Sequence, residues 1–303
     1  MLPAVRKKLA TARSLTVTIV GAGNLGTALA LALPPAGYAV KFIATRATVA
    51  ASPRTKALAR RVKARLAHLG KQSLDTDVVW ITVPDDAIAQ VARRLAGTQD
   101  WKGKIVFHSS GALTSDELAP LRRKGAYVAS VHPMMTFVRG VVPDKNGVAF
   151  AIEGDVVAVR AAKEIVARLG GRRFGIRKQN KVLYHAFGSF TSPLVVALMA
   201  SLEQVALAAG VRKQDIKPVM APLLLQTLQN YFKHDAASAF SGPLARGDVA
   251  TLRKHLQELK AVPGAREVYI ALSRAAVKHL PVRNRMGLAE ELRKRRPNKR
   301  ALR

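Results

Sequence analysis

A short glycine-rich segment near the start of the chain limits the folds that this sequence can adopt. Residues 21–26 read Gly-Ala-Gly-Asn-Leu-Gly, which is the spacing G-x-G-x-x-G. A run of mainly β-branched residues (15–20) precedes the segment, and an Ala- and Leu-rich stretch with helical character (24–33) overlaps and follows it. The motif alone is weak evidence, but this strand–turn–helix context is the one in which it binds a dinucleotide.

Each glycine of the motif has a separate role in such a turn. We expect Gly21 to make the tight turn after the strand, Gly23 to let the backbone approach a pyrophosphate, and Gly26 to let the helix pack close to the strand. The N–H groups at the start of the helix, at Asn24 and Leu25, are then expected to face the phosphates. The alternative is a glycine turn in a sheet that binds nothing.

The rest of the chain divides into two parts with different patterns. Up to about residue 177, apolar runs alternate with amphipathic stretches, which predicts an α/β doubly wound (Rossmann) parallel sheet. The expected strands are 15–20, 38–45, one within 63–67, 77–83, 104–108, 127–131, 148–152 and 171–176. The expected helices of this part are 24–33, 53–62, 86–95, 115–124 and 157–169.

Beyond residue 177 only helical spacing of apolar residues occurs. The expected helices are 180–209, with a kink at Pro193, then 215–232, 248–260 and 264–279. The sequence therefore predicts a Rossmann domain over residues 14–177, an all-α domain over 178–281 and a basic tail over 282–303.

The residues at the end of the second strand indicate which dinucleotide binds. NAD-binding domains carry Asp or Glu roughly 20 residues after the glycine motif, where the carboxylate binds the ribose hydroxyls. This chain instead has Thr45 and Arg46. A guanidinium can pair with a 2′-phosphate and stack on adenine, so the sequence favours NADP (NADPH). The alternative is that Arg46 is one more basic residue of a very basic chain.

Polar side chains follow three of the predicted strands, at the edge of the sheet where ligands bind. Val83 and Pro84 are expected to pass the nicotinamide ribose, and Asp85 to cap the next helix. His108 and His132 are candidate catalytic groups because two imidazoles at neighbouring strand ends can face one crevice. Ser109 and Ser110, which follow His108, are candidates for binding substrate. The alternative for each histidine is a structural role.

Two basic residues lie at the start of the helical part. Lys181 and His185 are four residues apart, so they share one face of a helix. An ammonium or imidazole at a cleft can donate a proton to a carbonyl or imine as hydride arrives. Arg246, between Gly242 and Gly247, is a candidate clamp for an anionic substrate. The alternative for the lysine and histidine is a solvent-facing basic helix start.

The charge of the chain suggests a polyanion partner but does not prove one. The 50 Lys and Arg residues against 19 Asp and Glu give a net charge of +31. Such a charge attracts nucleic acid non-specifically, but the sequence contains no recognition module, so a solvated basic surface is the favoured explanation of the charge.

The remaining composition excludes several classes of protein. The chain has no cysteine, and its seven histidines and its carboxylates show no ligand spacing, so we expect neither disulfides nor a metal site. No uninterrupted apolar run approaches the roughly 18 residues that span a bilayer, so no membrane partner is expected and a cytoplasmic location is predicted.

Taken together, these segments resemble a known family. The chain is similar to the bacterial Rossmann-like oxidoreductases whose C-terminal half is a domain of unknown function. This family is related to pyrroline-5-carboxylate reductase, ketopantoate reductase and the 6-phosphogluconate/β-hydroxyacid dehydrogenases. The segments that carry the resemblance are residues 21–26, 83–85, 108–111, 132–133, 181–185 and 241–248.

The resemblance implies an NADP-binding Rossmann domain and a helical domain like that of 6-phosphogluconate dehydrogenases, which often mediates dimerisation. A homodimer is therefore expected. The β-hydroxyacid dehydrogenases carry a catalytic Lys with an Asn four residues later. Lys181 matches that Lys, whereas His185 stands in place of the Asn. The proton donor therefore remains open between these two residues.

Three hypotheses about function follow from the sequence. The first is an NADP-dependent oxidoreductase that moves hydride to or from a small, anionic carbonyl, imine or hydroxy acid. The second is a non-catalytic NADP-binding sensor or assembly module. The third, which rests on charge alone, is an accessory nucleic-acid binder.

Overall fold

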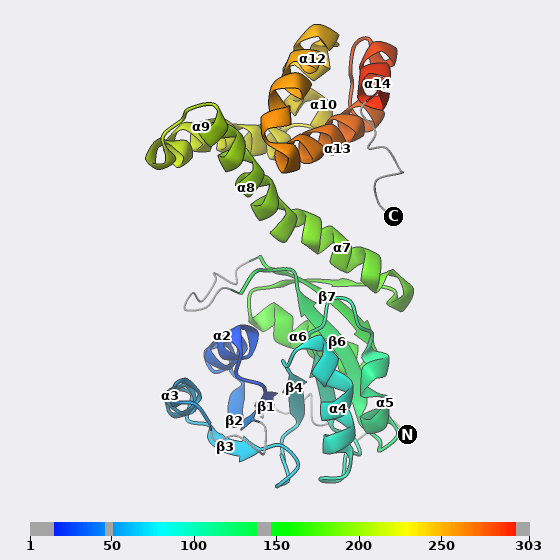
Figure 1. Ribbon diagram of the computed structural model, residues 1–303. Helices are drawn as coiled ribbons and strands as arrows, with labels where there is room; N and C mark the ends of the chain where they lie inside the picture. The colour runs from blue at the N-terminus through cyan, green and yellow to red at the C-terminus, as the bar shows by residue number, and fades with distance from the viewer. Residues whose placement is uncertain (1–14, 46–50, 138–146, 295–303) are drawn as a thin grey trace, which may run out of the picture. The chain divides into compact units, whose positions relative to one another are not determined.

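The computed structural model describes residues 15–45, 51–137 and 147–294 (Figure 1). The chain forms two compact units, Met1–Ser189 and Phe190–Arg303. Each unit is described by itself below.

The first unit is built on one eight-stranded sheet. The strand order is β3-β2-β1-β4-β5-β6-β7-β8, and every neighbouring pair is parallel except β6 and β7. The doubly wound sheet predicted from the sequence is therefore confirmed. Its strands are β1 (Thr16–Val20), β2 (Ala39–Thr45), β3 (Arg65–His68), β4 (Val78–Ile81), β5 (Ile105–His108), β6 (Tyr127–Pro133), β7 (Ala149–Gly154) and β8 (Arg172–Gly175).

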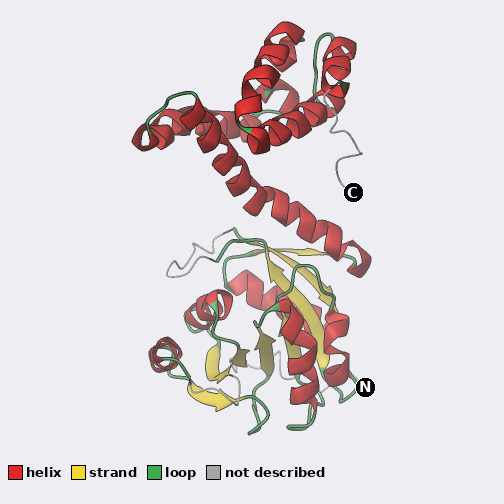
Figure 2. Ribbon diagram, viewed as in Figure 1, coloured by secondary structure: helices red, strands yellow, loops and turns green. Residues whose placement is uncertain are grey.

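Helices cover both faces of this sheet (Figure 2). Successive residues of a strand point to opposite faces, so β4 sends Trp80 to one core and Val79 and Ile81 to the other. The first core includes residues of α2 (Asn24–Ala32), α3 (Pro53–Arg61) and α6 (Val156–Arg168). The second includes residues of α4 (Asp85–Ala96), η1 (Ser115–Leu118) and α5 (Ala119–Arg122).

Strand β7 runs against its neighbour β6, which the sequence did not predict. Parallel neighbours need a long crossover, usually a helix, and the residues between β6 and β7 carry no helical pattern. In the antiparallel register Ser130 lies opposite Glu153, and His132 lies opposite Ala151. The carboxylate of Glu153 is thereby placed beside the middle of β6.

The second unit contains only helices and turns among its described residues, as predicted. Its small core joins Leu252, Leu256, Ile270 and Val277 to Leu288 and Leu292. Its helices are α8 (Pro193–Ala208), α9 (Lys213–Lys233), α10 (Ala236–Ala239), α11 (Pro243–Arg246), α12 (Val249–Glu258), η3 (Leu259–Ala261), α13 (Pro263–His279) and α14 (Arg285–Arg293).

Helix α14 lies in the segment that the sequence analysis predicted to be a basic tail. The structure differs there because Leu288 and Leu292, four residues apart, share one helix face and are fully buried. Buried Glu291 accepts hydrogen bonds from Arg253 of α12 at 3.2 and 3.3 Å. The high charge of the segment masked this short apolar stripe.

The two units divide later in the chain than the predicted boundary at residue 177. The short helix η2 (Lys178–Asn180) and most of α7 (Lys181–Thr191) group with the first unit, because Lys181 and Tyr184 are buried there. The predicted helix 180–209 is broken at Ser192, just before Pro193 begins α8. Proline cannot donate the helical hydrogen bond, which accounts for the break.

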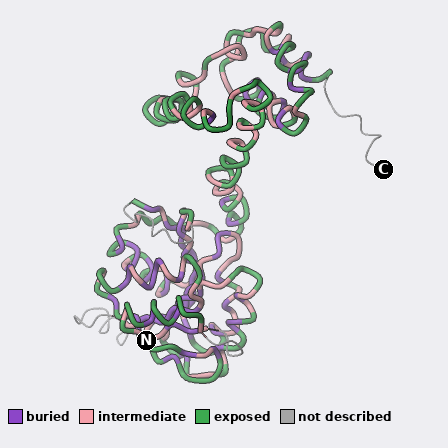
Figure 3. The backbone as a smooth tube through the Cα atoms, turned by 60° about the vertical axis from the view of Figure 1, so that its left-hand side comes forward, coloured by how far each residue is buried: buried purple, intermediate pink, exposed green. Residues whose placement is uncertain are grey.

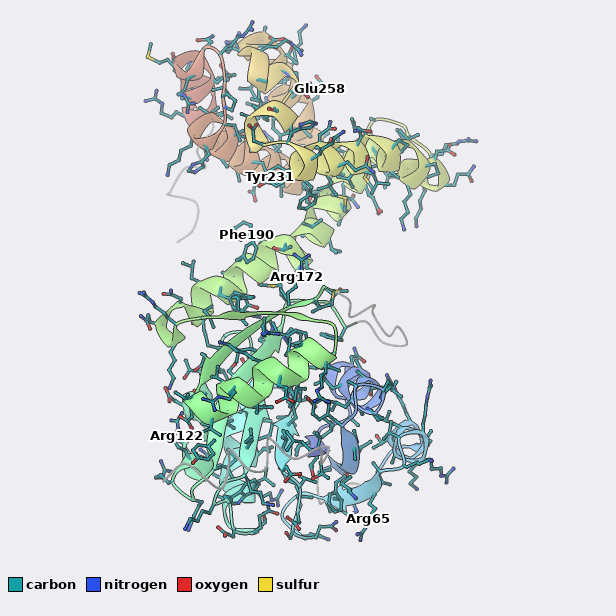
Figure 4. The ribbon with its side chains drawn as sticks, turned by 180° about the vertical axis from the view of Figure 1, so that it is seen from behind. Arg65, Arg122, Arg172, Phe190, Tyr231 and Glu258 are labelled. Carbon is teal, nitrogen blue, oxygen red and sulfur yellow. The ribbon has the colours of Figure 1, made fainter. Side chains whose placement is uncertain are left out.

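Much of α8 and α9 is apolar and exposed (Figure 3). By length and composition alone, residues 178–208 are long and apolar enough to cross a membrane, with mean hydropathy 1.5 and none of the apolar window buried. Figure 4 labels two exposed aromatic residues of the second unit, Phe190 and Tyr231, whose exposed fractions are 70% and 54%. The second unit therefore presents an apolar surface that its own residues leave uncovered.

The close packing at Gly26 predicts a stability defect. A Cβ atom there would lie 2.0 Å from the carbonyl oxygen of Gly21, so Gly26→Ala must displace backbone. We expect the free energy of unfolding to fall by about 3 kcal/mol. The melting temperature should fall by roughly 2–4 °C for each kcal/mol lost. Gly23→Ala is the matched control, since its Cβ meets no atom within 4 Å. Equal melting temperatures for the two variants in a thermal denaturation scan would contradict this prediction.

Candidate active site

The glycine turn forms where β1 meets β4 at the middle of the sheet. Gly21 has φ +99°, a conformation that favours glycine. The Thr82 hydroxyl after β4 lies 2.7 Å from the carbonyl oxygen of Gly21 and 3.1 Å from that of Val20. The close approach of Gly26 to Gly21 then seats the start of α2 directly against the turn.

The start of α2 is suited to a pyrophosphate. Gly23 is the N-cap and is exposed, and no side chain caps the helix, so the N–H groups of its first turn lack intrahelical partners. The space that a Cβ of Gly23 would enter is open. A phosphate group fits this arrangement of backbone donors and positive helix dipole. The side chain of Asn24 donates to the carbonyl oxygen of Phe137 at 2.8 Å, which ties the turn to the segment after β6.

The end of β2 lies beside the turn, as a site for the adenosine end of a dinucleotide requires. The N–H of Gly21 donates to the carbonyl oxygen of Ala44 at 3.0 Å, and half-buried Thr45 is the next residue. Arg46, the predicted partner of a 2′-phosphate, lies outside the described residues. Leu25 is half-buried in the first turn of α2.

The segment after β4 reaches the same edge. Val83 is half-buried, with its Cγ1 3.0 Å from the position of a Cβ on Gly21, and exposed Pro84 is the N-cap of α4. Asp85 was expected to be that cap, but it is the first residue of the helix. Its Oδ2 accepts a hydrogen bond of 2.6 Å from the hydroxyl of Ser110. Asp85 therefore ties α4 to the loop after β5.

His108, the last residue of β5, is fully buried. Its Nδ1 accepts from the N–H of Ser110 at 3.1 Å, and its Nε2 lies 2.9 Å from the carbonyl oxygen of Thr114. These partners require a proton on Nε2 and none on Nδ1. Burial lowers the pKa of His108 to about 4, so the ring is neutral. The geometry gives His108 a part in shaping the loop, and its catalytic role stays a prediction.

The two serines after His108 are also engaged. The hydroxyl of Ser109 accepts from the indole N–H of Trp80 at 2.8 Å. The Ser110 hydroxyl oxygen accepts from the N–H groups of Ala112 and Leu113 while donating to Asp85. This loop is therefore rigidly held before any ligand arrives, and the predicted substrate contacts of both serines remain untested.

Lys181 lies beneath the loop and is completely buried. Its Nζ donates to the carbonyl oxygen of Ser110 at 3.0 Å and to the hydroxyl of Ser130 at 2.7 Å. Burial lowers the pKa of Lys181 to about 8, against the opposing effects of Glu153 and Asp85. The ammonium therefore links the loop after β5 to the middle of β6.

The carboxylate of Glu153, on the neighbouring strand β7, also has hydrogen-bond partners. Glu153, opposite Ser130, accepts from the N–H and hydroxyl of Ser115 at 2.6 and 2.8 Å. Buried polar groups of this kind are stable only when hydrogen-bonded, and each member of the network is.

His132 lies at the carboxyl end of β6 with two aromatic neighbours from α7. Its Nδ1 lies 2.9 Å from the hydroxyl oxygen of Tyr184, and its ring centroid is 6.1 Å from that of His185. Burial, followed by the charges of Lys181 and His185, lowers the pKa of His132 to about 4. A Cβ on Gly111 would lie 2.9 Å from His132 Nε2 and 2.6 Å from His185 Cδ2. Only a glycine lets both imidazoles pack this closely against the loop.

The structure thus brings together Lys181, His132 and the Ser110–Gly111 backbone, with His185 beside them. Lys181 and His185 share α7 as predicted, but the first is buried and the second is exposed. Tyr184 was missed, although its position three residues after Lys181 placed it on the same side of the helix.

Two further predictions concern residues elsewhere. Arg246 is exposed and belongs to the second unit, where Gly247 ends its helix in a left-handed conformation and Asp248 caps α12. Within residues 15–45, 51–137 and 147–294, no group of three or more His, Asp or Glu side chains is placed to bind a metal.

Comparisons with known proteins agree with this architecture. Residues 2–133 match the model of a Rossmann-like domain, and residues 148–276 match the Domain of unknown function (DUF2520). The chain joins a Rossmann-like domain to a DUF2520 domain. The resemblance stated from the sequence is therefore confirmed. A search of the curated proteins found no match.

Several solved structures share the fold. A protein from Bacteroides fragilis, provisionally assigned as an NADP oxidoreductase, has a TM-score of 0.70 at 21% identity, covering 86% of this chain and 97% of its own. An imine reductase from Myxococcus stipitatus in complex with NADP+ has a TM-score of 0.60 at 18% identity, covering 87% and 94%.

A pyrroline-5-carboxylate reductase from Coxiella burnetii has a TM-score of 0.57 at 14% identity, covering 93% of this chain and 97% of its own. A variant of the Myxococcus enzyme is in complex with NAD+. These similarities show an oxidoreductase-like fold whose neighbours include nicotinamide-dependent reductases.

The neutral histidines predict an acid-sensitive fold. Both His108 and His132 have a folded-state pKa of about 4, below the ordinary 6.5, so the unfolded chain binds more protons between these values. The free energy of unfolding is therefore expected to fall as the pH drops from 6.5 toward 4.

Urea unfolding followed by fluorescence of the buried Trp80 and Trp101 measures this dependence. His132→Asn is expected to reduce the pH dependence of the free energy of unfolding between about pH 7 and about pH 5. The control His234→Asn, at an exposed position, should leave this pH dependence unchanged. A wild-type stability that is flat across this range would refute the neutral assignment.

Proposed function

We propose that the protein is an NADP-dependent reductase that transfers hydride to a small carbonyl or imine substrate. The observation that carries the proposal is the alignment of the open glycine turn with the preorganised loop and His132 along one edge of the sheet. Ligands of open α/β sheets bind at this edge, at the switch point between strands. When bound, the nicotinamide supplies the hydride.

The chain's own residues account for the rest of the reaction. Gly21, Gly23 and Gly26, with the N–H groups of Asn24 and Leu25, are suited to the pyrophosphate, and Val83 and Pro84 border the path to the reacting ring. Lys181, His132 and His185 are the candidate proton donors near the loop after β5. A small anion is favoured as substrate by the net charge of +31. The clamp role of Arg246, which belongs to the second unit, stays a prediction.

The preference for NADP rests on Thr45 and Arg46. A charge-assisted contact to the 2′-phosphate contributes about 1.5–3 kcal/mol, which is roughly a tenfold to hundredfold difference in affinity. We expect the protein to bind NADPH more tightly than NADH by such a factor, and Arg46→Ala to remove most of the difference.

Fluorescence titration with NADPH and NADH tests this preference. Arg172→Ala is the control, because Arg172 is exposed on β8, at the opposite edge of the sheet from β3. Gly23→Ala is expected to weaken the binding of both nucleotides. Equal affinity for the two nucleotides, or an unchanged preference in Arg46→Ala, would remove the role given to Arg46.

A non-catalytic NADP sensor is the second candidate function, favoured by the extensive engagement of His108, Ser109 and Ser110 within the protein. The two functions differ in one measurement. Tight NADPH binding without NADPH oxidation across small 2-oxo acids and cyclic imines would favour the sensor. The cytoplasmic location and the non-specific binding of nucleic acid expected from the sequence remain predictions.

We further propose that the protein is a homodimer formed through its helical unit. The apolar residues exposed on α8 and α9 support this, since exposed patches of this kind mark interaction surfaces. An apolar cavity of about 840 Å³ within the same unit, lined by residues of α8, α12 and α13, adds to the apolar surface that a partner would cover. A second copy provides such a surface without any further protein.

Light scattering after gel filtration measures the mass directly. We expect about twice the chain mass of 32.6 kDa, and a shift toward the monomer when Leu223 and Phe232, which are 75% and 81% exposed, are both changed to Glu. The control Gln226→Glu/Gln229→Glu places the same two negative charges on exposed polar positions of α9. A monomeric wild-type protein would rule out the dimer.

A further inference from the structure

The hydrogen-bonded pair of His132 and Tyr184 stands out from the buried network around Lys181. Tyr184 is 8% exposed, and its ring lies at 87° to the His132 ring with centroids 5.5 Å apart. The ring centroid of Phe174, on the edge strand β8, lies 5.9 Å from that of Tyr184. The pair is therefore held in one geometry by β6, β8 and α7.

The position of the protons in this pair follows from the chemistry of its two members. Burial raises the pKa of Tyr184 to about 12 and is the first cause of the low pKa of His132, so both side chains are uncharged at neutral pH. A phenol hydroxyl is a better donor than a neutral imidazole N–H, and an imidazole nitrogen is the better acceptor. Tyr184 therefore donates to Nδ1, which leaves the ring proton of His132 on Nε2.

In the part of the chain that the structure describes, this N–H has no acceptor. Within residues 15–45, 51–137 and 147–294, no residue forms a hydrogen bond with Nε2 of His132, and this nitrogen is not among the fully buried polar atoms without a partner. It lies against Gly111, whose lack of a side chain lets the His132 and His185 imidazoles pack this closely on the loop backbone. Nε2–H is thus a donor next to the loop that follows β5.

Lys181 lies deeper in the same arrangement. Its Nζ binds Ser130, which precedes His132 by two residues on β6 and faces the same side of the sheet. Two residues of a strand span about 7 Å, so the ammonium lies one layer of side chains below the imidazole. Two of its three N–H groups donate to Ser110 and Ser130, which hold the ammonium against the loop and β6.

We propose that His132 is the proton donor of this site, that Tyr184 replenishes its proton, and that Lys181 is a positioning residue that fixes the loop. This proposal rests on the reductase function proposed above. As hydride bonds to the substrate carbon, the π electrons of the C=O or C=N bond move to the heteroatom. That atom takes the proton from Nε2, while Nδ1 takes the hydroxyl proton of Tyr184.

The products of this step are an alcohol or amine, a neutral imidazole in its other tautomer and a tyrosinate, which regains its proton from water. The transfer is favourable because an alkoxide or amide anion forming on the substrate is a stronger base than tyrosinate. A general acid matched in this way contributes about 10²–10⁴-fold to a rate.

The first test needs no substrate. In the full-length protein with ¹⁵N-labelled histidine, the ¹⁵N chemical shifts of His132 report which ring nitrogen carries the proton. We expect Nε2–H in the wild-type protein and a mixture of tautomers in Tyr184→Phe, with Tyr231→Phe as the control. A proton on Nδ1 in the wild type would overturn the proposal whether or not turnover is found.

The second test uses NADPH with 2-methyl-1-pyrroline and with pyruvate as probes. His132→Gln, which keeps a donor but cannot transfer a proton, is expected to lower kcat about a hundredfold at unchanged NADPH affinity. Tyr184→Phe is expected to lower kcat about tenfold and to alter its pH profile. The controls His234→Asn and Tyr231→Phe should leave kcat unchanged.

The outcomes separate the two proposals. If the wild-type protein does not bind NADPH, the reductase function is refuted. The tautomer of His132 is still measured independently. Normal turnover in His132→Gln and Tyr184→Phe, together with loss of turnover in Lys181→Met at retained NADPH affinity, would overturn the present assignment and make Lys181 the donor.

Discussion

The buried ammonium of Lys181 is the interaction on which the candidate site depends. An unpaired charge in a protein interior is very costly, so the surrounding groups must be hydrogen-bonded and correctly placed for this lysine to be buried at all. Ser110 and Ser130 meet it from two neighbouring strands, and Glu153 lies opposite Ser130. The position of the loop after β5 and the burial of the first turns of α7 are therefore linked. If either moved, the buried ammonium of Lys181 would lose its hydrogen-bond partners.

The nucleotide-binding end of the sheet is held by a different principle. There, the absence of side chains at Gly21 and Gly26 lets backbone meet backbone, and the open position at Gly23 leaves helix donors free. Close backbone packing shapes one end of the proposed crevice, and the hydrogen bonds around the charge of Lys181 shape the other. The side chain of Asn24 joins the two ends through its hydrogen bond to Phe137, beyond β6.

The sequence predicted the parts of this structure that depend on local pattern. The glycine turn, the alternation of strands and helices and the change to helices alone all follow from spacing along the chain. Two features depended on contacts between distant residues and were missed. Tyr184 meets His132 across 52 positions, and the direction of β7 leaves no trace in an apolar run. Helix α14 was missed for a third reason, since two buried leucines were outweighed by the surrounding charge.

The antiparallel course of β7 has a consequence for the electrostatics of the crevice. In a parallel strand, the last residues would reach the rim where ligands bind. Because β7 runs the other way, its carboxylate at Glu153 is level with Ser130, below the imidazole of His132, while Ala151 occupies the place beside that imidazole. The carboxylate of Glu153, which opposes the charge of Lys181, therefore lies below the crevice. It does not repel a negatively charged ligand at close range.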